Sequence, residues 1–357
     1  MTQTNALHWR DLPAPVLSIL RKGAVIPAHP LALDSERKFD QASQRAISRY
    51  YVDAGSGGLA VGVHSTQFAI REVGLYKPVL QLAIETAREW TDRPLVMIAG
   101  AVGKTAQAVE EARTARGMGY HAVLLSLAAL KGASEDELIE HCTSVSREMP
   151  LIGFYLQTAV GGIPLSRGFW SRFAAIDNVV AIKVAPFNRY RTLDVAFGIA
   201  NAHAEERITL YTGNDDHIVA DLVTPLVVRT GNREVTLRFQ GGLLGHWSVW
   251  ARGAVKLLEK LKLAVASGPV TPEILALDSF VTDCNSVVFD VDHDFAGCIP
   301  GCHEILRRQG LMQTTNCLDP HEKLSPGQSE GIDRLYATYP ELNDDAFVAA
   351  NLERWRN

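Results

Sequence analysis

Lys183 is the residue of this sequence whose setting most favours covalent chemistry. It lies in the apolar run VVAIKVA at residues 179–185, and a strand formed by that run would be buried on both faces. Burial disfavours a charged ammonium group and lowers its pKa, and the neutral amine is the form that attacks a carbonyl carbon to give a Schiff base. The alternative is a lysine at the end of a strand that reaches solvent or a carboxylate.

Tyr155 ends the apolar run LIGFY at residues 151–155, one strand-helix unit before Lys183. A tyrosine hydroxyl beside an amine can move protons while a carbinolamine forms and breaks down. We therefore predict Lys183 and Tyr155 as a catalytic pair, with the amine within a few ångströms of the hydroxyl. The alternative is a core tyrosine whose hydroxyl is bonded within the fold.

The elements that must position these residues follow a repeat of about thirty residues, typical of one strand-helix unit. Eight apolar runs begin near residues 24, 57, 94, 121, 150, 178, 207 and 235. Most are continuous rather than alternating, as parallel strands buried on both faces are. Helical patterns lie between them at residues 35–52, 105–118, 194–202 and 252–266, and Ser134 with Glu137 forms a capping box.

This order predicts an α/β fold, a (β/α)₈ TIM barrel with a C-terminal helical extension. We place an N-terminal segment at residues 1–22, the barrel at 23–266 and the extension at 267–357. The eighth strand follows a turn at Gly231-Asn232. An open doubly wound sheet would give a similar local pattern, but no glycine-rich dinucleotide motif follows the first strand.

Composition excludes several classes of function. Hydrophobic residues make up 47% and charged residues 21% of the 357, and the net charge is −5. There is no Lys/Arg-rich run, so we expect no nucleic-acid partner, and no run of eighteen apolar residues, so we expect no membrane span. Residues 1–16 lack the apolar segment of a signal peptide, and five cysteines fit a reducing cytoplasm.

Several motifs, in this order and spacing, resemble the dihydrodipicolinate synthase and N-acetylneuraminate lyase family of class I aldolases. The resemblance spans about residues 23–266 and rests on Phe154-Tyr155, on Ala181-Ile182-Lys183, and on residues 54–62, 99–108 and 211–215. It implies a Schiff base on Lys183, proton transfer by Tyr155, and a homodimer or homotetramer. No cofactor is implied, because the imine itself is the electron sink.

The sequence departs from the family at three loops. Residues 62–67 read GVHSTQ where the family has a Gly-Thr-Thr-Gly-Glu loop for the carboxylate of a 2-oxo acid. No hydroxyl occurs at residues 127–130, and no arginine occurs at 156–162. We therefore expect a small-molecule carbonyl substrate other than that of dihydrodipicolinate synthase, with pyruvate forming an imine poorly.

The remaining candidates surround the predicted barrel mouth. We expect substrate contacts from His64, Ser65, Thr66, Gly213 and His246, with Asp215 and Gln240 as weaker candidates. The set Cys284, His293, Cys298, Cys302 and His303 matches no standard zinc spacing, so we expect no metal.

The predicted function is a Schiff-base-forming lyase, an aldolase or hydro-lyase. The alternatives are a sugar-acid dehydratase of the same superfamily and a non-catalytic ligand-binding barrel. We expect exposed parts of the extension, including Phe347 and Trp355, to cover a partner subunit.

Overall fold

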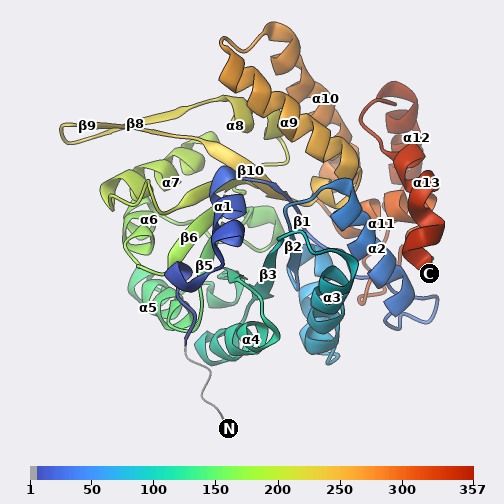
Figure 1. Ribbon diagram of the computed structural model, residues 1–357, viewed down its shortest axis with the longest axis horizontal. Coiled ribbons are helices and arrows are strands. Elements are labelled where there is room, and N and C mark those ends of the chain that lie inside the picture. The colour runs from blue at the N-terminus through green and yellow to red at the C-terminus, as the bar shows by residue number, and fades with distance from the viewer. Residues whose placement is uncertain (1–5) are drawn as a thin grey trace.

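Eight parallel strands form a barrel in the computed structural model, which describes residues 6–357 (Figure 1). The order around the sheet is β1-β10-β7-β6-β5-β4-β3-β2. Ala28 pairs with Ala60 and joins the two end strands, so the predicted barrel is confirmed. The strands are β1 (Val25–Pro27), β2 (Gly58–Val61), β3 (Val96–Ala101), β4 (Ala122–Leu125), β5 (Leu151–Tyr155), β6 (Val179–Val184), β7 (Thr209–Thr212) and β10 (Phe239–Leu244).

Each strand is buried on both faces, which explains its continuous apolar sequence. Along β5, Ile152 and Phe154 belong to the core inside the barrel, whereas Leu151 and Tyr155 belong to the core between the strands and the helices. Successive side chains of a strand point to opposite faces, so neighbours in sequence separate into these two cores.

Helices alternate with the strands and cover the outside of the barrel (Figure 1). The capping box at α5 is confirmed, because Ser134 N donates to Glu137 Oε2 at 2.7 Å and Glu137 N donates to Ser134 Oγ at 3.3 Å. The predicted helix at residues 35–52 begins later, where the Asp40 side chain caps α2. The helices are α2 (Gln41–Ala54), α3 (Tyr76–Trp90), α4 (Thr105–Met118), α5 (Glu135–Ser146), α6 (Arg167–Ala174), α7 (Arg189–Asn201), α8 (Ile218–Val223) and α9 (Ala251–Ser267).

The N-terminal residues form a helix that the sequence analysis did not predict, α1 (Ala14–Lys22). Its Val16 and Leu20 side chains belong to the core inside the barrel. The Tyr211 hydroxyl also donates to Leu20 O at 2.8 Å. The helix therefore covers the amino-terminal end of the barrel. The first five residues of the predicted N-terminal segment lie outside the described part of the chain.

The predicted eighth strand was placed too early. Residues near Val235 belong instead to an antiparallel hairpin of β8 (Leu226–Thr230) and β9 (Arg233–Leu237), which projects beside α7 (Figure 1). Buried and exposed residues alternate in this hairpin, which is typical of a ribbon with one solvated face. Continuous burial, the pattern of the barrel strands, starts only with β10.

The C-terminal extension is helical, as predicted, and packs on the barrel (Figure 1). It comprises α10 (Pro272–Val288), α11 (Cys298–Arg308), α12 (Gln328–Thr338) and α13 (Asp345–Arg356). No helix within residues 6–357 combines the length and the apolar character that crossing a bilayer requires.

The expectation that the exposed part of the extension, including Trp355 and Phe347, covers a partner is wrong for Trp355. Trp355 is fully buried within its own chain, where its indole N–H donates to Asp53 Oδ2 at 2.6 Å and its ring lies 5.4 Å from that of Tyr50. Phe347 packs on the same two rings. These aromatic contacts therefore fix α13 to α2, and Trp355 is not available to another subunit.

Candidate active site

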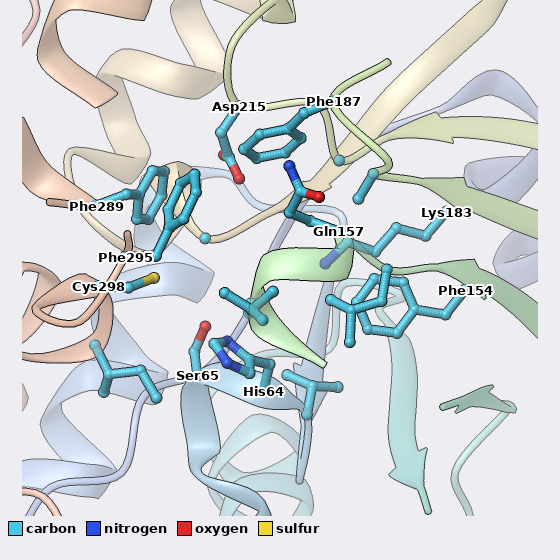
Figure 2. A pocket seen from close by; sticks show the side chains of 18 of the residues that line it. His64, Ser65, Phe154, Gln157, Lys183, Phe187, Asp215, Phe289, Phe295 and Cys298 are labelled. Carbon is cyan, nitrogen blue, oxygen red and sulfur yellow. The ribbon is translucent and has the colours of Figure 1, made fainter. Parts of the chain in front are cut away.

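A cavity lies between the carboxyl ends of the barrel strands and the start of α11. Active sites of barrels of this kind form at this end of the strands. Figure 2 shows the side chains that project into it. Its lining comprises Ala28, Val63, His64, Ser65, Phe154, Leu156, Gln157, Val160, Lys183, Ala185, Phe187, Gly213, Asp215, Gly245, Phe289, Phe295, Cys298, Ile299 and Cys302.

Lys183 extends into this cavity from β6 (Figure 2). Its Nζ lies 4.4 Å from the ring centroid of Phe154, the residue opposite it on β5. Burial lowers the pKa of the Lys183 ammonium to about 8, although the charges of Asp215 and Cys298 oppose the shift. An appreciable fraction of the lysine is therefore neutral near pH 7. The structure places Lys183 in the predicted position, and its covalent role stays a prediction.

Gly213 provides the room that the lysine side chain occupies. A Cβ at this position, directly after β7, would lie 2.7 Å from Lys183 Cε and 2.8 Å from the Cβ of Ala185. Real Cβ atoms do not approach so closely, so a larger residue would displace the lysine. Gly213 lines the cavity, as predicted for a substrate contact, and it also sets the position of Lys183.

Asp215 faces the same cavity two residues further along (Figure 2). The backbone N–H of His246 donates to its Oδ1 at 3.4 Å, and Asn285 Nδ2 donates to its carbonyl oxygen at 2.6 Å. Burial raises the pKa of the Asp215 carboxyl to about 7, and the charge of Lys183 partly offsets the rise. Asp215 and Lys183 form no direct ion pair in the described chain, so substrate can lie between them.

His64 and Ser65 begin the turn after β2 and line the cavity beside each other (Figure 2). Burial, with a smaller contribution from the charge of Lys183, lowers the pKa of the His64 imidazole to about 4. The ring is therefore neutral at pH 7 and can donate from one nitrogen and accept at the other. Both residues lie where the sequence analysis expected substrate contacts.

Thr66 was predicted to bind substrate, but it does not line the cavity. Its hydroxyl oxygen accepts hydrogen bonds from Gly62 N at 2.9 Å and Val63 N at 3.2 Å, and the hydroxyl donates to His29 O at 2.7 Å. All three bonds are made to backbone groups, so the hydroxyl supports the backbone that carries His64 and Ser65 and ties it to the segment after β1.

The predicted pairing of Tyr155 with Lys183 is not present in the structure. Tyr155 points away from the barrel interior, where its ring packs 5.2 Å from that of Trp170. Its hydroxyl donates to Leu165 O at 3.1 Å and accepts from Leu165 N at 3.2 Å. It is a core tyrosine with a satisfied hydroxyl, and Phe154 takes the inward place beside the amine.

The side chain of His246, also predicted as a substrate contact, lies outside the cavity lining. The ring packs edge-on against Trp250 at 5.9 Å, and burial lowers the pKa of its imidazole to about 4. Its contribution to the site is the backbone N–H that binds Asp215. Gln240, a weaker candidate, does not line the cavity either.

Part of the site comes from the C-terminal extension and was not predicted from the sequence. Phe289, Phe295 and Ile299 line the cavity together with Phe187 from the loop after β6. Their sequence carries no strand or helix periodicity that would place them there. Cys298 and Cys302, which drew attention only as metal ligands, line it from α11.

Both of these thiols stay protonated near neutral pH, because burial raises their pKa. Among residues 6–357, no group of three or more His, Cys, Asp or Glu side chains is arranged to hold a metal ion.

Comparisons with known proteins agree with this geometry. The model of the dihydrodipicolinate synthetase family matches residues 22–226. N-acetylneuraminate lyase 2 of Escherichia coli O6:H1 is 21% identical over 315 residues, which cover 87% of this chain and 91% of the lyase. A protein of Acinetobacter baumannii named as a probable 5-dehydro-4-deoxyglucarate dehydratase is 30% identical over 112 residues, 31% of this chain and 36% of that protein.

Solved structures of this family share the fold. The crystal structure of dihydrodipicolinate synthase from Aquifex aeolicus superposes with a TM-score of 0.73 at 17% identity, and the match covers 90% of this chain and 99% of that one. Members of this family are class I aldolase-type lyases that act through a Schiff base. The family match extends over more than half of the chain, and the chain belongs to the dihydrodipicolinate synthetase family.

Proposed function

We propose that this protein is a lyase in which Lys183 forms a Schiff base with a 2-oxo acid or a related carbonyl compound. The observation that carries the proposal is the amine of Lys183, shielded from bulk water at the barrel mouth, with its pKa lowered to about 8. Burial of an amine without a partner lowers the stability of the fold, and a role in covalent catalysis explains why the amine is there.

The covalent step follows from the neutral amine. Lys183 Nζ adds to the carbonyl carbon, and a proton moves from nitrogen to the former carbonyl oxygen. A general acid then donates one further proton, so that the hydroxyl leaves as water and a protonated imine remains. The imine then accepts the electron pair of the carbon–carbon bond that breaks. A base takes the hydroxyl proton of the departing carbon, which leaves as an aldehyde.

Asp215 is the group we assign to these proton transfers. The pKa of its carboxyl, about 7, is close to that of Lys183, so a proton can pass in either direction at little cost. It faces the cavity, and the backbone N–H of His246 orients its carboxylate. Phe154 has no group that can transfer a proton, and the Tyr155 hydroxyl is hydrogen-bonded to the backbone of Leu165.

His64 and Ser65 are the groups we assign to the carboxylate or hydroxyl of the substrate next to the carbonyl. Both line the cavity close to the turn that Thr66 supports. A neutral imidazole and a hydroxyl can each donate one hydrogen bond, which is a weaker carboxylate site than a charged side chain would provide.

Reduction with borohydride tests the Schiff base. In the presence of a carbonyl substrate, reduction should add the mass of the substrate to the peptide that holds Lys183, and the Lys183→Ala variant should not be labelled. Lys262 is a matched control, because its pKa is also lowered by burial but its Nζ donates to Lys22 O and Gly23 O. Labelling that persists in Lys183→Ala, or moves to Lys262, would overturn the proposal.

Product analysis separates cleavage from dehydration. The partial likeness to a dehydratase keeps loss of water as the second candidate. An aldehyde released together with a 2-oxo acid indicates a lyase that cleaves carbon–carbon bonds, whereas a product lighter by one water indicates the dehydratase. A ligand that binds with neither product nor labelling would indicate a non-catalytic barrel.

We also propose that the protein is cytoplasmic and forms a homodimer or homotetramer. The cysteines form no disulfide, which suits a reducing compartment. The oligomer rests on the family, since Phe347 and Trp355 pack inside their own chain. Sedimentation as a monomer at micromolar concentration would contradict it.

A further inference from the structure

We infer that the substrate carries an apolar group, best a ring, at the end remote from its carbonyl. The inference rests on the proposed function, because Lys183 fixes the carbonyl end. The remote end would lie against Phe187, Phe289 and Phe295, which we call the aromatic wall. All three rings line the cavity that Lys183 enters (Figure 2).

The aromatic wall joins two parts of the chain that are far apart in sequence. Phe187 follows β6 and Phe295 precedes α11, yet their ring centroids lie 6.0 Å apart at an interplanar angle of 67°. Phe289 is 3% exposed and packs against Gly245, where a Cβ would come within 3.0 Å of its ring. The extension therefore completes the cavity with aromatic surface rather than merely covering the barrel.

Backbone strain indicates that two of these rings are held in place for a purpose. Phe187 has φ 49° and Phe295 has φ 67°, in the left-handed region that bulky residues rarely adopt. Strain of this kind persists where the surroundings over-determine it, and it is concentrated at functional sites. Both strained residues turn an aromatic ring towards the same cavity.

The hydrogen bonds around these residues maintain the strained backbone. Phe187 N donates to Asn214 Oδ1 at 3.1 Å, next to Asp215. On the other side, the Asp290 carboxylate accepts from Gly297 N at 2.8 Å and from Ser325 Oγ at 2.5 Å, which closes the turn that carries Phe295. The wall is thus formed before substrate binds.

The charges of the cavity argue against a second anionic group on the substrate. All residues that line the cavity lie in the described part of the chain, and Lys183 is the only cationic side chain among them. Imine formation uses that amine. Asp215 carries negative charge whenever it is ionised and would repel a carboxylate in this region. Gln157 also lines the cavity, but Phe187, Phe289 and Phe295 offer no partner to the polar groups of a sugar acid or a dicarboxylate, and polar groups left unpaired there are unfavourable.

Three 2-oxo acids with the same reacting end and different tails test the inference. The probes are 4-phenyl-2-oxobutanoate, pyruvate and 2-oxoglutarate, each reduced with borohydride on the wild-type protein and quantified as labelled Lys183 peptide. Ring burial predicts that the phenyl compound labels at least ~10-fold more efficiently than pyruvate, since a single methylene in an apolar pocket already discriminates about tenfold or more. We expect 2-oxoglutarate to label least.

Variants locate the effect in the aromatic wall. Phe295→Ala should lower labelling by the phenyl compound far more than labelling by pyruvate, which has no tail to reach the ring, and so remove most of the preference. Phe280→Ala is the matched control, because Phe280 packs against Tyr339 and does not line the cavity. Thermal unfolding of both variants shows whether the fold is intact, and Phe295→Leu should retain much of the preference if the full truncation unfolds.

The outcomes separate the two proposals. Equal labelling of Lys183 by all three probes, or preferred labelling by 2-oxoglutarate, overturns the apolar substrate and leaves the Schiff base standing. Absence of Lys183 labelling with every carbonyl tried overturns the proposed function itself.

Discussion

Phe154 and Lys183 lie opposite each other on β5 and β6, with the Lys183 Nζ 4.4 Å from the centroid of the phenyl ring. The face of the ring attracts the ammonium form of the lysine, but it can neither donate nor accept a proton. Phe154 therefore cannot carry out the proton transfers of a Schiff-base reaction. We assign those transfers to Asp215, which faces the same cavity.

The first prediction concerns Tyr155. Tyr155→Phe should leave labelling of Lys183 within about twofold of the wild type and lower the free energy of unfolding by about 1–3 kcal/mol. The reason is that the hydroxyl exchanges two hydrogen bonds with Leu165, whose backbone groups would be left unpaired in the core. Urea unfolding and borohydride labelling measure the two effects on the same preparation.

A loss of labelling of a hundredfold or more, with an unchanged unfolding transition, would instead restore Tyr155 to the chemistry. Phe154→Tyr is the complementary variant, since it places a hydroxyl on the inward side of β5. It should accelerate imine formation if proton transfer limits the rate.

The error over Tyr155 shows what an apolar strand leaves undetermined. The run LIGFY is buried throughout, so hydrophobicity does not distinguish the residues that face the barrel interior from those that face the helices. A shift of one residue exchanges the two faces. The pairing of Phe154 with Lys183 resolves the ambiguity, and that register depends on the neighbouring strand.

Other parts of the site follow from the sequence more directly. Lys183 stands out because a charged residue in a buried strand is rare, and the repeat of strands and helices places it at the barrel mouth. Phe289 and Phe295 could not be found in this way, because they lie in irregular segments whose positions depend on tertiary packing. The left-handed φ of Phe295 is likewise imposed by its surroundings.

The second prediction concerns the pH dependence of labelling. Imine formation needs the neutral amine, so the rate should fall as the pH drops below the Lys183 pKa of about 8, by about tenfold per pH unit. The negative charge of Asp215 raises that pKa, and Asp215→Asn removes it. The midpoint of the pH profile should therefore move to lower pH in this variant.

Asp215→Asn should at the same time slow substrate cleavage by about 10²–10⁴-fold, the usual contribution of a general acid or base. Asp216→Asn is the matched control, since Asp216 is exposed and does not line the cavity. A profile that shifts to higher pH, or cleavage that is unaffected, would rule out the assigned role.

The third prediction tests the space around the amine. Gly213→Ala should reduce labelling by about 10²-fold, because the new methyl group overlaps Lys183 Cε and a misplacement of about 1 Å is costly for a reacting group. Gly117→Ala, in α4, meets no atom within 4 Å and should label normally. Unaltered labelling in Gly213→Ala would show that the lysine does not need its present position.

The last prediction concerns His64 and the reacting end of the substrate. The side chain of His64 lies beside Ser65, and its neutral imidazole fills the part of the cavity where the family has a small hydroxyl-bearing residue. We expect pyruvate to label wild-type Lys183 poorly and dihydrodipicolinate formation to be undetectable. His64→Thr replaces the ring with a smaller donor, which leaves more room for the carboxylate, and should raise pyruvate labelling by up to about tenfold, equivalent to about 1.4 kcal/mol. Ser65→Ala should lower it, because a neighbouring donor is lost. Efficient pyruvate labelling of the wild type, with no response to either substitution, would show that this loop does not determine the choice of substrate.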